Sequence, residues 1–255
     1  MSAHLWLPRA SLCRPLVFLV TVSFLGCNDP PATLEEVVER NTEAAGGRAA
    51  LEAVHSIQVD LHIVDPGFAV DGVYRAIRPG QMRIDVMSDG KHVFTEALNS
   101  SRAWQWKGKG APVGASSTAA AALQHGVELP GKLFGLHEAR PRGHQLDLVG
   151  RETVDGIDYN VLRLTFSDGY TTFLYVDPGT WLITRRRDRR PLHPDVDPTP
   201  TTIESRYSDF RRIAGVQFSF ANTDVDLATG KVLETTTVKS ILVNPAVAEV
   251  IFETL

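Results

Sequence analysis

The feature that most constrains this chain is a two-residue alternation of apolar and polar side chains, which recurs over most of its length. It is clearest at 57–63, where branched aliphatic residues take every second position. Successive side chains of a strand point to opposite faces, so this pattern predicts strands with one buried face. Pairs such as Asp155-Gly156 and Asp168-Gly169 separate the alternating stretches and are typical of tight hairpin turns. The chain therefore reads as a meander of short antiparallel strands.

Applied along the whole chain, the pattern predicts about ten or eleven strands in one curved antiparallel sheet. The clearest strands are expected at 57–63, 82–86, 104–106, 146–151, 159–166, 171–176, 181–187, 203–210, 216–221 and 232–243. Helices are expected over 33–54, over part of 112–137 and over 245–252. The predicted fold class is mainly β (α+β).

The first 26 residues read as a targeting segment. Arg9 and Arg14 precede an apolar run over 16–26, too short for a membrane-spanning helix of ~20 residues but suited to a signal peptide. The run ends in Phe24-Leu25-Gly26-Cys27, which resembles the lipobox of bacterial lipoproteins, where the cysteine is diacylated and becomes the first mature residue. The alternative is a soluble secreted protein, but no Ala-x-Ala-like cleavage site follows the run.

These observations divide the chain into a signal peptide at 1–26, a tether at 27–32 and a folded domain at 33–255. We expect a lipoprotein of the bacterial cell envelope, anchored through acylated Cys27 and facing the periplasm. Asn28, next to the cysteine, favours the outer membrane over the inner one.

Composition and motifs exclude several other classes. A net charge of -4 argues against a nucleic-acid binder, which is usually basic. Cys13 and Cys27 are the two cysteines, too few for a disulfide scaffold or a thiolate zinc site. The sequence lacks Gly-x-Ser-x-Gly, His-Glu-x-x-His, Walker A and Gly-x-Gly-x-x-Gly patterns, which disfavours the familiar hydrolases, zincins and nucleotide enzymes. No cofactor is predicted.

Three stretches carry a resemblance to a known family. They are Ala44-Ala45-Gly46-Gly47-Arg48-Ala49-Ala50-Leu51, the run from Phe173 to Ile183, and Tyr207-Ser208-Asp209-Phe210 followed by Gly215-Val216-Gln217-Phe218. Together with the order of elements, they make the chain similar to the LolA/LolB/LppX-like envelope proteins. The resemblance implies an unclosed, strongly curved β-barrel, covered by a helical lid that the 112–137 insertion would supply. It also implies an apolar cavity that holds acyl chains.

Apolar residues of the predicted strands are the candidates for the cavity lining. They are Ile57, Val59, Leu61, Ile63, Met82, Ile84, Val86, Trp104, Trp106, Leu162, Leu164 and Phe166. Trp104 and Trp106 share one face of a strand beside the candidate lid, so we expect them near the ligand. The alternative is that these side chains simply form a core against the helical segments.

Two charged segments are candidates for binding sites. In the arginine run at 185–190, alternate side chains face opposite sides of a strand, and Arg185 and Arg187 are the candidates for contact with phosphate head groups or an acidic partner. The alternative is a solvated edge strand whose charges prevent further pairing. His193, Asp195 and Asp197 could face one metal ion, but the loop lacks the repeated oxygen ligands of a calcium site, so no metal is predicted.

The predicted function is a non-enzymatic, lipid-anchored carrier or acceptor for the acyl chains of a lipid or lipoprotein, working with an envelope transport partner. One alternative is a lipid-anchored enzyme acting on envelope lipid or peptidoglycan, which clustered titratable groups at the cavity mouth would favour. The other is a structural envelope subunit without a ligand, which a filled interior would favour.

Overall fold

The computed structural model describes residues 32–253, except 101 and 195. Residues Ala32–Leu255 form one compact unit, and its hydrophobic clusters are built from residues of that unit. This part of the chain therefore contains its own core. The predicted signal peptide at 1–26, the lipidation site Cys27 and most of the tether at 27–32 lie outside the described residues.

The unit begins with two short helices, α1 (Leu34–Ala44) and α2 (Arg48–Glu52). The hydroxyl of Thr33 accepts a hydrogen bond from the backbone N–H of Glu36 at 3.2 Å, which caps the start of α1. Gly46 ends the first helix with a φ of 134°, a conformation that suits glycine. The predicted helical region at 33–54 is thus two helices joined by a tight turn.

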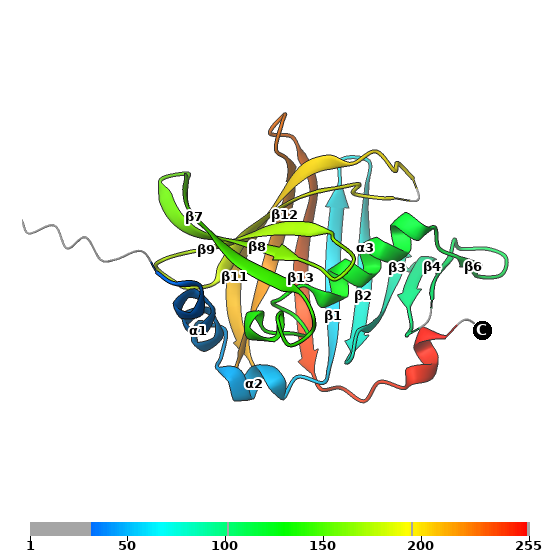
Figure 1. The fold of residues 1–255 in the computed structure, drawn as a ribbon. Coiled ribbons are helices and arrows are strands. Elements are labelled where there is room, and N and C mark those ends of the chain that lie inside the picture. The colour runs from blue at the N-terminus through cyan, green and yellow to red at the C-terminus, as the bar shows by residue number, and fades with distance from the viewer. Residues whose placement is uncertain (1–31, 101, 195, 254–255) are drawn as a thin grey trace, which may run out of the picture. The chain divides into compact units, whose positions relative to one another are not determined.

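One antiparallel sheet of thirteen strands makes up most of the unit, as Figure 1 shows. The strands of the first half are β1 (Ser56–Asp65), β2 (Phe68–Ile77), β3 (Gln81–Ser88), β4 (Lys91–Leu98), β5 (Ala103–Trp106) and β6 (Val113–Gly114). Those of the second half are β7 (Gln145–Val154), β8 (Ile157–Thr165), β9 (Thr171–Val176), β10 (Ile183–Arg190), β11 (Thr201–Ile213), β12 (Val216–Asp226) and β13 (Val232–Val243). The predicted single antiparallel sheet is confirmed, but it has thirteen strands where ten or eleven were expected, and the two-residue β6 is among those that the sequence pattern did not reveal.

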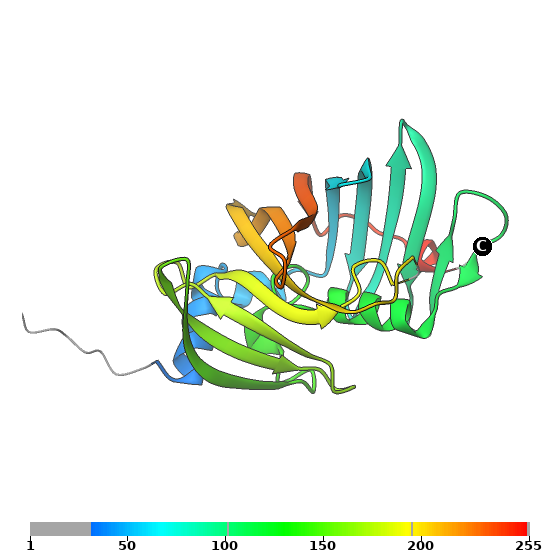
Figure 2. The same ribbon diagram turned by 90° about the horizontal axis from the view of Figure 1, so that it is seen from above.

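The strand order explains why a segment must cross the open side of the sheet. It runs β6-β5-β4-β3-β2-β1-β13-β12-β11-β10-β9-β8-β7, so the first strand pairs with the last and the sheet is unclosed. The edges are β6 and β7, which are consecutive along the chain. The segment between them therefore has to pass from one edge to the other, and it carries helix α3 (Ser117–Glu128) and the short 3-10 helix η1 (Leu136–Glu138). Figure 2 shows α3 alongside the curved sheet.

This crossing segment has two parts with different roles, which corrects the expectation that all of 112–137 is a lid. Helix α3 packs against β3, β4 and β5. The chain after it turns into the interior, where Leu133, Phe134 and Leu136 are almost fully buried. Arg78, between β2 and β3, secures this turn by donating to the Leu133 carbonyl at 2.9 Å and to the Glu138 carboxylate at 2.5 and 3.0 Å. Residues 133–139 are therefore part of the core.

We call the inner face of the sheet the one that carries Ile57, Val59, Leu61 and Ile63, and the opposite one the outer face. The inner face supports two hydrophobic clusters, one centred on β1–β3 and β12 with the turn at 133–134, the other on β7–β9 with α1. The 3-10 helix η2 (Glu249–Phe252) ends the described chain and is shorter than the predicted helix at 245–252. No helix of the described residues is long and apolar enough to cross a membrane.

Candidate ligand cavity

A cavity of about 390 Å³ lies against the inner face, between the middle of the sheet and the buried turn after α3. We call it the inner cavity. Its volume falls in the range of ligand pockets, about 300–1,000 Å³. Strands β12 and β13 pair over Ala221–Val225 and Val232–Thr237. Beyond these pairs the lining includes Gln217 and Ser219 of β12 and Val238 and Ile241 of β13.

The inner cavity has an apolar part and a polar part. Aliphatic and aromatic side chains line the first: Leu51, Ile57, Val59, Leu61, Ile63, Leu129, Phe134, Leu136, Leu182, Ile183, Val216, Phe218, Val238 and Ile241. The polar part consists of side chains on neighbouring strands, together with Lys132 from the turn after α3. The strand residues are Arg186, Ser205, Asn222, Asp224, Glu234 and Thr236. A cavity with an apolar part and a polar part is complementary to an amphiphile, a molecule with an apolar chain and a polar head group.

The carboxylates of Asp188 and Asp224, near the polar part, both bind Arg190. Arg190 donates from Nε to Asp188 Oδ1 at 3.1 Å and from Nη2 to Asp224 Oδ2 at 3.0 Å. The hydroxyl of Tyr170 also donates to Asp188, at 2.6 Å. Burial by itself raises the pKa of Asp224, but the charges of Arg190 and Arg186 and the hydrogen bonds to this carboxyl hold its pKa below the ordinary value. Asp224 therefore stays ionised, and Arg190 neutralises its charge within the sheet.

The cations that border the cavity are less well satisfied. Arg186 donates from Nη2 to Ser205 Oγ at 3.3 Å, and its Nε, 3.5 Å from Asp188, is buried without a hydrogen-bond partner. The ammonium of Lys132 lies 4.9 Å from the ring centre of Tyr74 and forms no ion pair with a described residue. Burial and the nearby charge of Arg186 lower the pKa of Lys132, against an opposite effect of Asp224.

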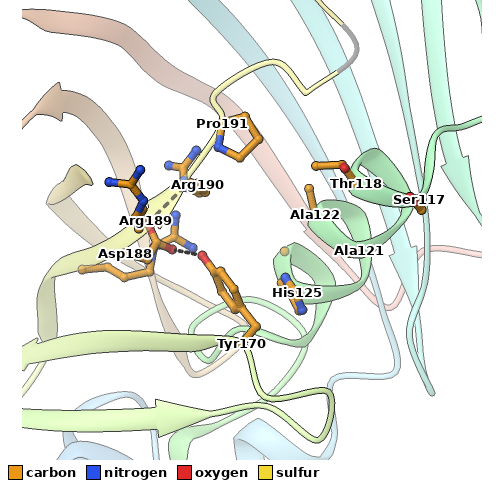
Figure 3. A pocket seen from close by; sticks show the side chains of 12 residues that line it. Ser117, Thr118, Ala121, Ala122, His125, Tyr170, Asp188, Arg189, Arg190 and Pro191 are labelled. Atoms are coloured by element: carbon orange, nitrogen blue, oxygen red, sulfur yellow. Dashed lines mark hydrogen bonds and ion pairs between the residues drawn. The ribbon is translucent and has the colours of Figure 1, made fainter. Parts of the chain in front are cut away.

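A second hollow of about 490 Å³ lies between α3 and strand β10, with Tyr170, just before β9, on its wall, and Figure 3 shows it. We call it the α3–β10 cleft. Gly126 and Arg186 line both the cleft and the inner cavity, so the two spaces adjoin at these residues. The cleft and the inner cavity are therefore neighbours on the two sides of these residues.

Histidine contacts tie α3 to the far half of the sheet. The ring of His125 stacks on Tyr170 with centres 4.0 Å apart, and its Nε2 lies 2.7 Å from Asp168 Oδ2. Glu128, at the end of the helix, lies 2.8 Å from His144 Nε2. These contacts hold the C-terminal half of α3 across the opening.

The predicted lining residues other than Trp104 and Trp106 fall into three groups. The four of β1, Ile57, Val59, Leu61 and Ile63, do line the inner cavity. Met82, Ile84 and Val86 share the inner face through their pairing with β2, and the first two pack in the central cluster. Leu162, Leu164 and Phe166 are buried in the cluster around α1 and η1 and do not line the inner cavity.

Trp104 and Trp106 share one face, as predicted, but it is the outer face, and this corrects their expected place beside the cavity. Gln105 pairs with Glu96, which pairs with the inward-facing Ile84, so Gln105 is the β5 residue that points inward. The indole of Trp104 instead donates to the Phe252 carbonyl at 2.8 Å under helix η2. Trp106 donates to the Gly110 carbonyl at 3.0 Å.

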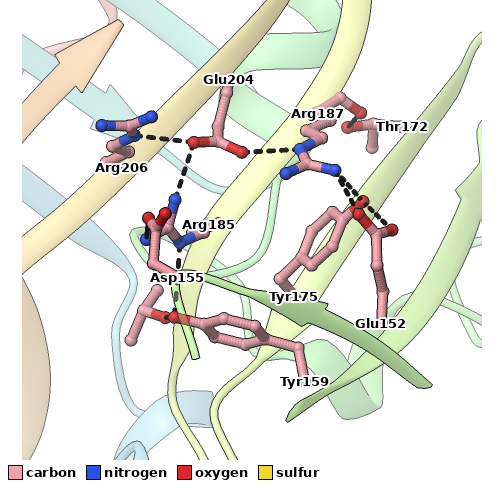
Figure 4. Close-up of polar contacts among 10 residues, drawn as sticks. Glu152, Asp155, Tyr159, Thr172, Tyr175, Arg185, Arg187, Glu204 and Arg206 are labelled. Carbon is pink, nitrogen blue, oxygen red and sulfur yellow. Dashed lines mark hydrogen bonds and ion pairs between the residues drawn. The ribbon is translucent and has the colours of Figure 1, made fainter. Parts of the chain in front are cut away.

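Arg185 and Arg187 also face outward and are occupied by carboxylates, as Figure 4 shows. Glu204 Oε1 accepts from Arg185 Nη1 at 2.8 Å, and Oε2 accepts from Arg187 Nε at 2.6 Å. Asp155 and Glu152 bind the outer ends of the two guanidinium groups, each at 2.6 Å. The expected alternation of the arginine run is present, but β10 pairs with β9 and β11, so the edge-strand alternative is wrong.

The described residues of the candidate metal loop, His193 and Asp197, do not come together around one point. His193 lies 3.6 Å from Asp65, Asp197 accepts from the Thr199 backbone at 2.9 Å, and Asp195 lies outside the described residues. No group of three His, Cys, Asp or Glu side chains in the described part of the chain is placed to hold a metal ion.

Sequence reasoning missed Lys132 and Arg186. Lys132 is the one lysine or arginine of the 112–137 insertion, and its position depends on a turn that returns into the sheet. Arg186 could have been found, because the alternation that sends Arg185 and Arg187 outward sends Arg186 inward.

Comparisons with known proteins support the fold. No protein-family model matches the sequence, and no curated protein matches it significantly. A LolA superfamily protein from Nitrosomonas europaea matches in structure with a TM-score of 0.55 at 16% identity, over 88% of this chain and 98% of that one. A DUF1329 family protein from Desulfovibrio piger matches with a TM-score of 0.54 at 14% identity, over 86% and 96%.

A domain from Vibrio parahaemolyticus, assigned to outer membrane lipoprotein sorting, matches with a TM-score of 0.52 at 10% identity, over 85% of this chain and 94% of that one. These likenesses cover nearly the whole of the described unit. The resemblance inferred from the sequence is therefore confirmed at the level of the fold: this chain has the fold of LolA superfamily and lipoprotein-sorting structures.

Proposed function

We propose that this chain is a lipid-anchored protein of the bacterial cell envelope that holds the acyl chains of a lipid or lipoprotein in the inner cavity. The observation that carries the proposal is the apolar part of that cavity, about 390 Å³ in total volume and built on the inner face of β1. Hydrocarbon placed there gains about 25 cal/mol for each Å² removed from water. Helix α3 would serve as the lid over this space.

The N-terminus supports a site of action at a membrane. With Cys27 acylated, residues 28–33 separate the anchor from the start of α1, a reach of about 20 Å when extended. The domain would thus stay close to the periplasmic face of the membrane, the outer one by preference. There it could receive a ligand from an envelope transport partner or pass one on.

The fold likeness supports a role in binding. One neighbour is described as a LolA superfamily protein and another as a domain for outer membrane lipoprotein sorting. The aspartates at and beside the polar part of the cavity are paired with Arg190, which binds both Asp188 and Asp224. This arrangement favours holding a ligand over turning it over, and an open cavity favours a ligand over a purely structural role.

The test is to purify residues 32–255 from bacteria and identify co-purified lipids by mass spectrometry, then to measure binding of a fluorescent fatty acid after delipidation. Leu61→Trp fills the cavity, and His62→Trp on the same strand points outward and serves as the control. We expect Leu61→Trp to weaken binding at least about tenfold and His62→Trp to leave it unchanged. A delipidated wild type that binds no acyl probe would refute the proposal, and recovery of cleaved lipid products would favour the enzyme instead.

A further inference from the structure

Charge at the polar part of the inner cavity is unevenly matched. Arg190 joins Asp188 and Asp224, so these two acids already have a cation and several hydrogen bonds. Glu234 accepts from Thr236 at 3.3 Å, and burial together with the charge of Asp224 raises its pKa toward the uncharged form. Arg186 and Lys132 then remain as cations that border the cavity without a full set of partners.

The two cations face the same space from opposite elements. Arg186 projects from β10 on the inner face and stands where the α3–β10 cleft adjoins the inner cavity. Lys132 projects from the buried turn after α3, over the ring of Tyr74. The charge of Arg186 disfavours the charged form of Lys132, and an anion between the two cations would relieve this repulsion.

Unsatisfied polar atoms mark the same place. Arg186 Nε is buried without a hydrogen-bond partner, as is Asn222 Oδ1, and both residues belong to the polar part of the inner cavity. Buried polar groups are normally paired, so these atoms indicate space for a polar group that the protein does not supply itself. The apolar part of the cavity begins beside them, at Ile63, which pairs with Thr236.

Resting on the proposed function, we infer that the inner cavity selects amphiphiles that carry an anionic head group, and that Lys132 and Arg186 bind this head group. The chain of the ligand then lies along β1 and the buried turn. The anion is a carboxylate or a phosphate, because guanidinium and ammonium groups bind both. A carboxylate would come from a free fatty acid and a phosphate from a phospholipid.

The test compares four ligands with one and the same chain: dodecanoate, dodecyl phosphate, dodecanol and dodecyltrimethylammonium. Each is titrated into delipidated residues 32–255 with calorimetry or native mass spectrometry as the readout. We expect at least one anion to bind about tenfold more tightly than dodecanol, and the cation to bind more weakly than dodecanol. A preference for dodecanoate indicates a fatty acid, and one for dodecyl phosphate indicates a phospholipid.

Lys132→Met should abolish the preference for anions while dodecanol binding stays the same. Lys239→Met is the matched control, since Lys239 is half-exposed and paired with Asp71, away from the cavity. Lys132→Glu is a second variant and should shift the preference toward the ammonium. Circular dichroism checks that each variant is folded.

Equal affinity for all four ligands would overturn this inference and leave the proposed function standing. So would a preference for the ammonium in the wild type, or an equal loss of dodecanol and anion binding in Lys132→Met. Failure of every ligand to bind would instead overturn the proposed function itself.

Discussion

Glu204 is the residue whose loss should most disturb the outer face of the sheet. Its carboxylate is 1% exposed and accepts hydrogen bonds from Arg185 at 2.8 Å, Arg187 at 2.6 Å and Arg206 at 2.6 Å. Glu204→Gln keeps the shape, removes the charge and turns an N–H₂ group toward one of the arginines. Three guanidinium groups would then face one another across β10 and β11 without their common anion.

The expected cost follows from burial. Removing one partner of a buried charge pair costs about 3–5 kcal/mol, and the half-exposed Arg206 places this site at the lower end, at about 3 kcal/mol. Glu152→Gln is the matched control, because Glu152 binds Arg187 in the same network but its side chain is 46% exposed. An exposed pair contributes about 1 kcal/mol or less.

The assay is urea unfolding of residues 32–255, followed by tryptophan fluorescence, at several pH values. Burial alone raises the pKa of Glu204, but hydrogen bonds from Arg206 and Arg187 and their charges outweigh it and hold the pKa below 4.5. The stabilisation is therefore complete above pH 4.5 and is lost as the pH falls through the lowered folded-state pKa. The gap between wild type and Glu204→Gln should be constant from pH 7 to about 5 and should shrink below that. Equal losses in Glu204→Gln and Glu152→Gln, or a gap that widens in acid, would refute this reasoning.

Three further predictions test other parts of the molecule. Trp104→Ala should lower the free energy of unfolding by about 3–5 kcal/mol in urea, because a buried indole is removed, but leave fatty-acid binding unchanged; weakened binding in a stable variant would contradict its outward placement. Cys27→Ser should lose incorporation of labelled palmitate in cells, and normal labelling would show that the anchor lies elsewhere. Gly46→Ala should destabilise by about 2 kcal/mol or more, since its Cβ would lie 2.3 Å from the Gly215 carbonyl oxygen at a φ of 134°, whereas Gly114→Ala, with no atom within 4 Å, should change stability little; equal effects of the two would disprove the close approach.

The strands were predictable because their signal is local. Alternation at 57–63 and the turn at Asp168-Gly169 each depend on neighbours in sequence, and β1 and the β8–β9 hairpin form where expected. Which face turns inward is not local. Trp104 and Trp106 alternate as well as Ile57 and Val59 do, but their face is set by register passed across β4, β3 and β2.

The candidate site shows the same division. Its apolar part on β1 follows from the pattern of one strand, so it could be predicted. Its polar part combines residues of three strands, Arg186 of β10, Asn222 and Asp224 of β12 and Glu234 of β13, with Lys132 from the insertion. The strand residues are brought together by strand pairing, and Lys132 by a turn whose sequence has no regular alternation of apolar and polar residues. The polar residues on β12 also break the alternation, so a simple apolar pattern hides their inward face.

The unpaired edges β6 and β7 give the sheet a mechanical property that a closed barrel lacks. In a closed barrel, strand number and shear fix the diameter, and widening it breaks ladder hydrogen bonds. In this open sheet we expect the two halves to be able to move apart by bending at the central pair β1 and β13. Helix α3 lies in the segment that connects the two edges. Under the proposed function, a ligand bulkier than the inner cavity would be accommodated by flexing of the sheet while its strand pairs are kept. Opening would break the few side-chain contacts of α3, such as those of His125 with Tyr170 and Asp168, so under the proposed function we expect this helix to control uptake and release.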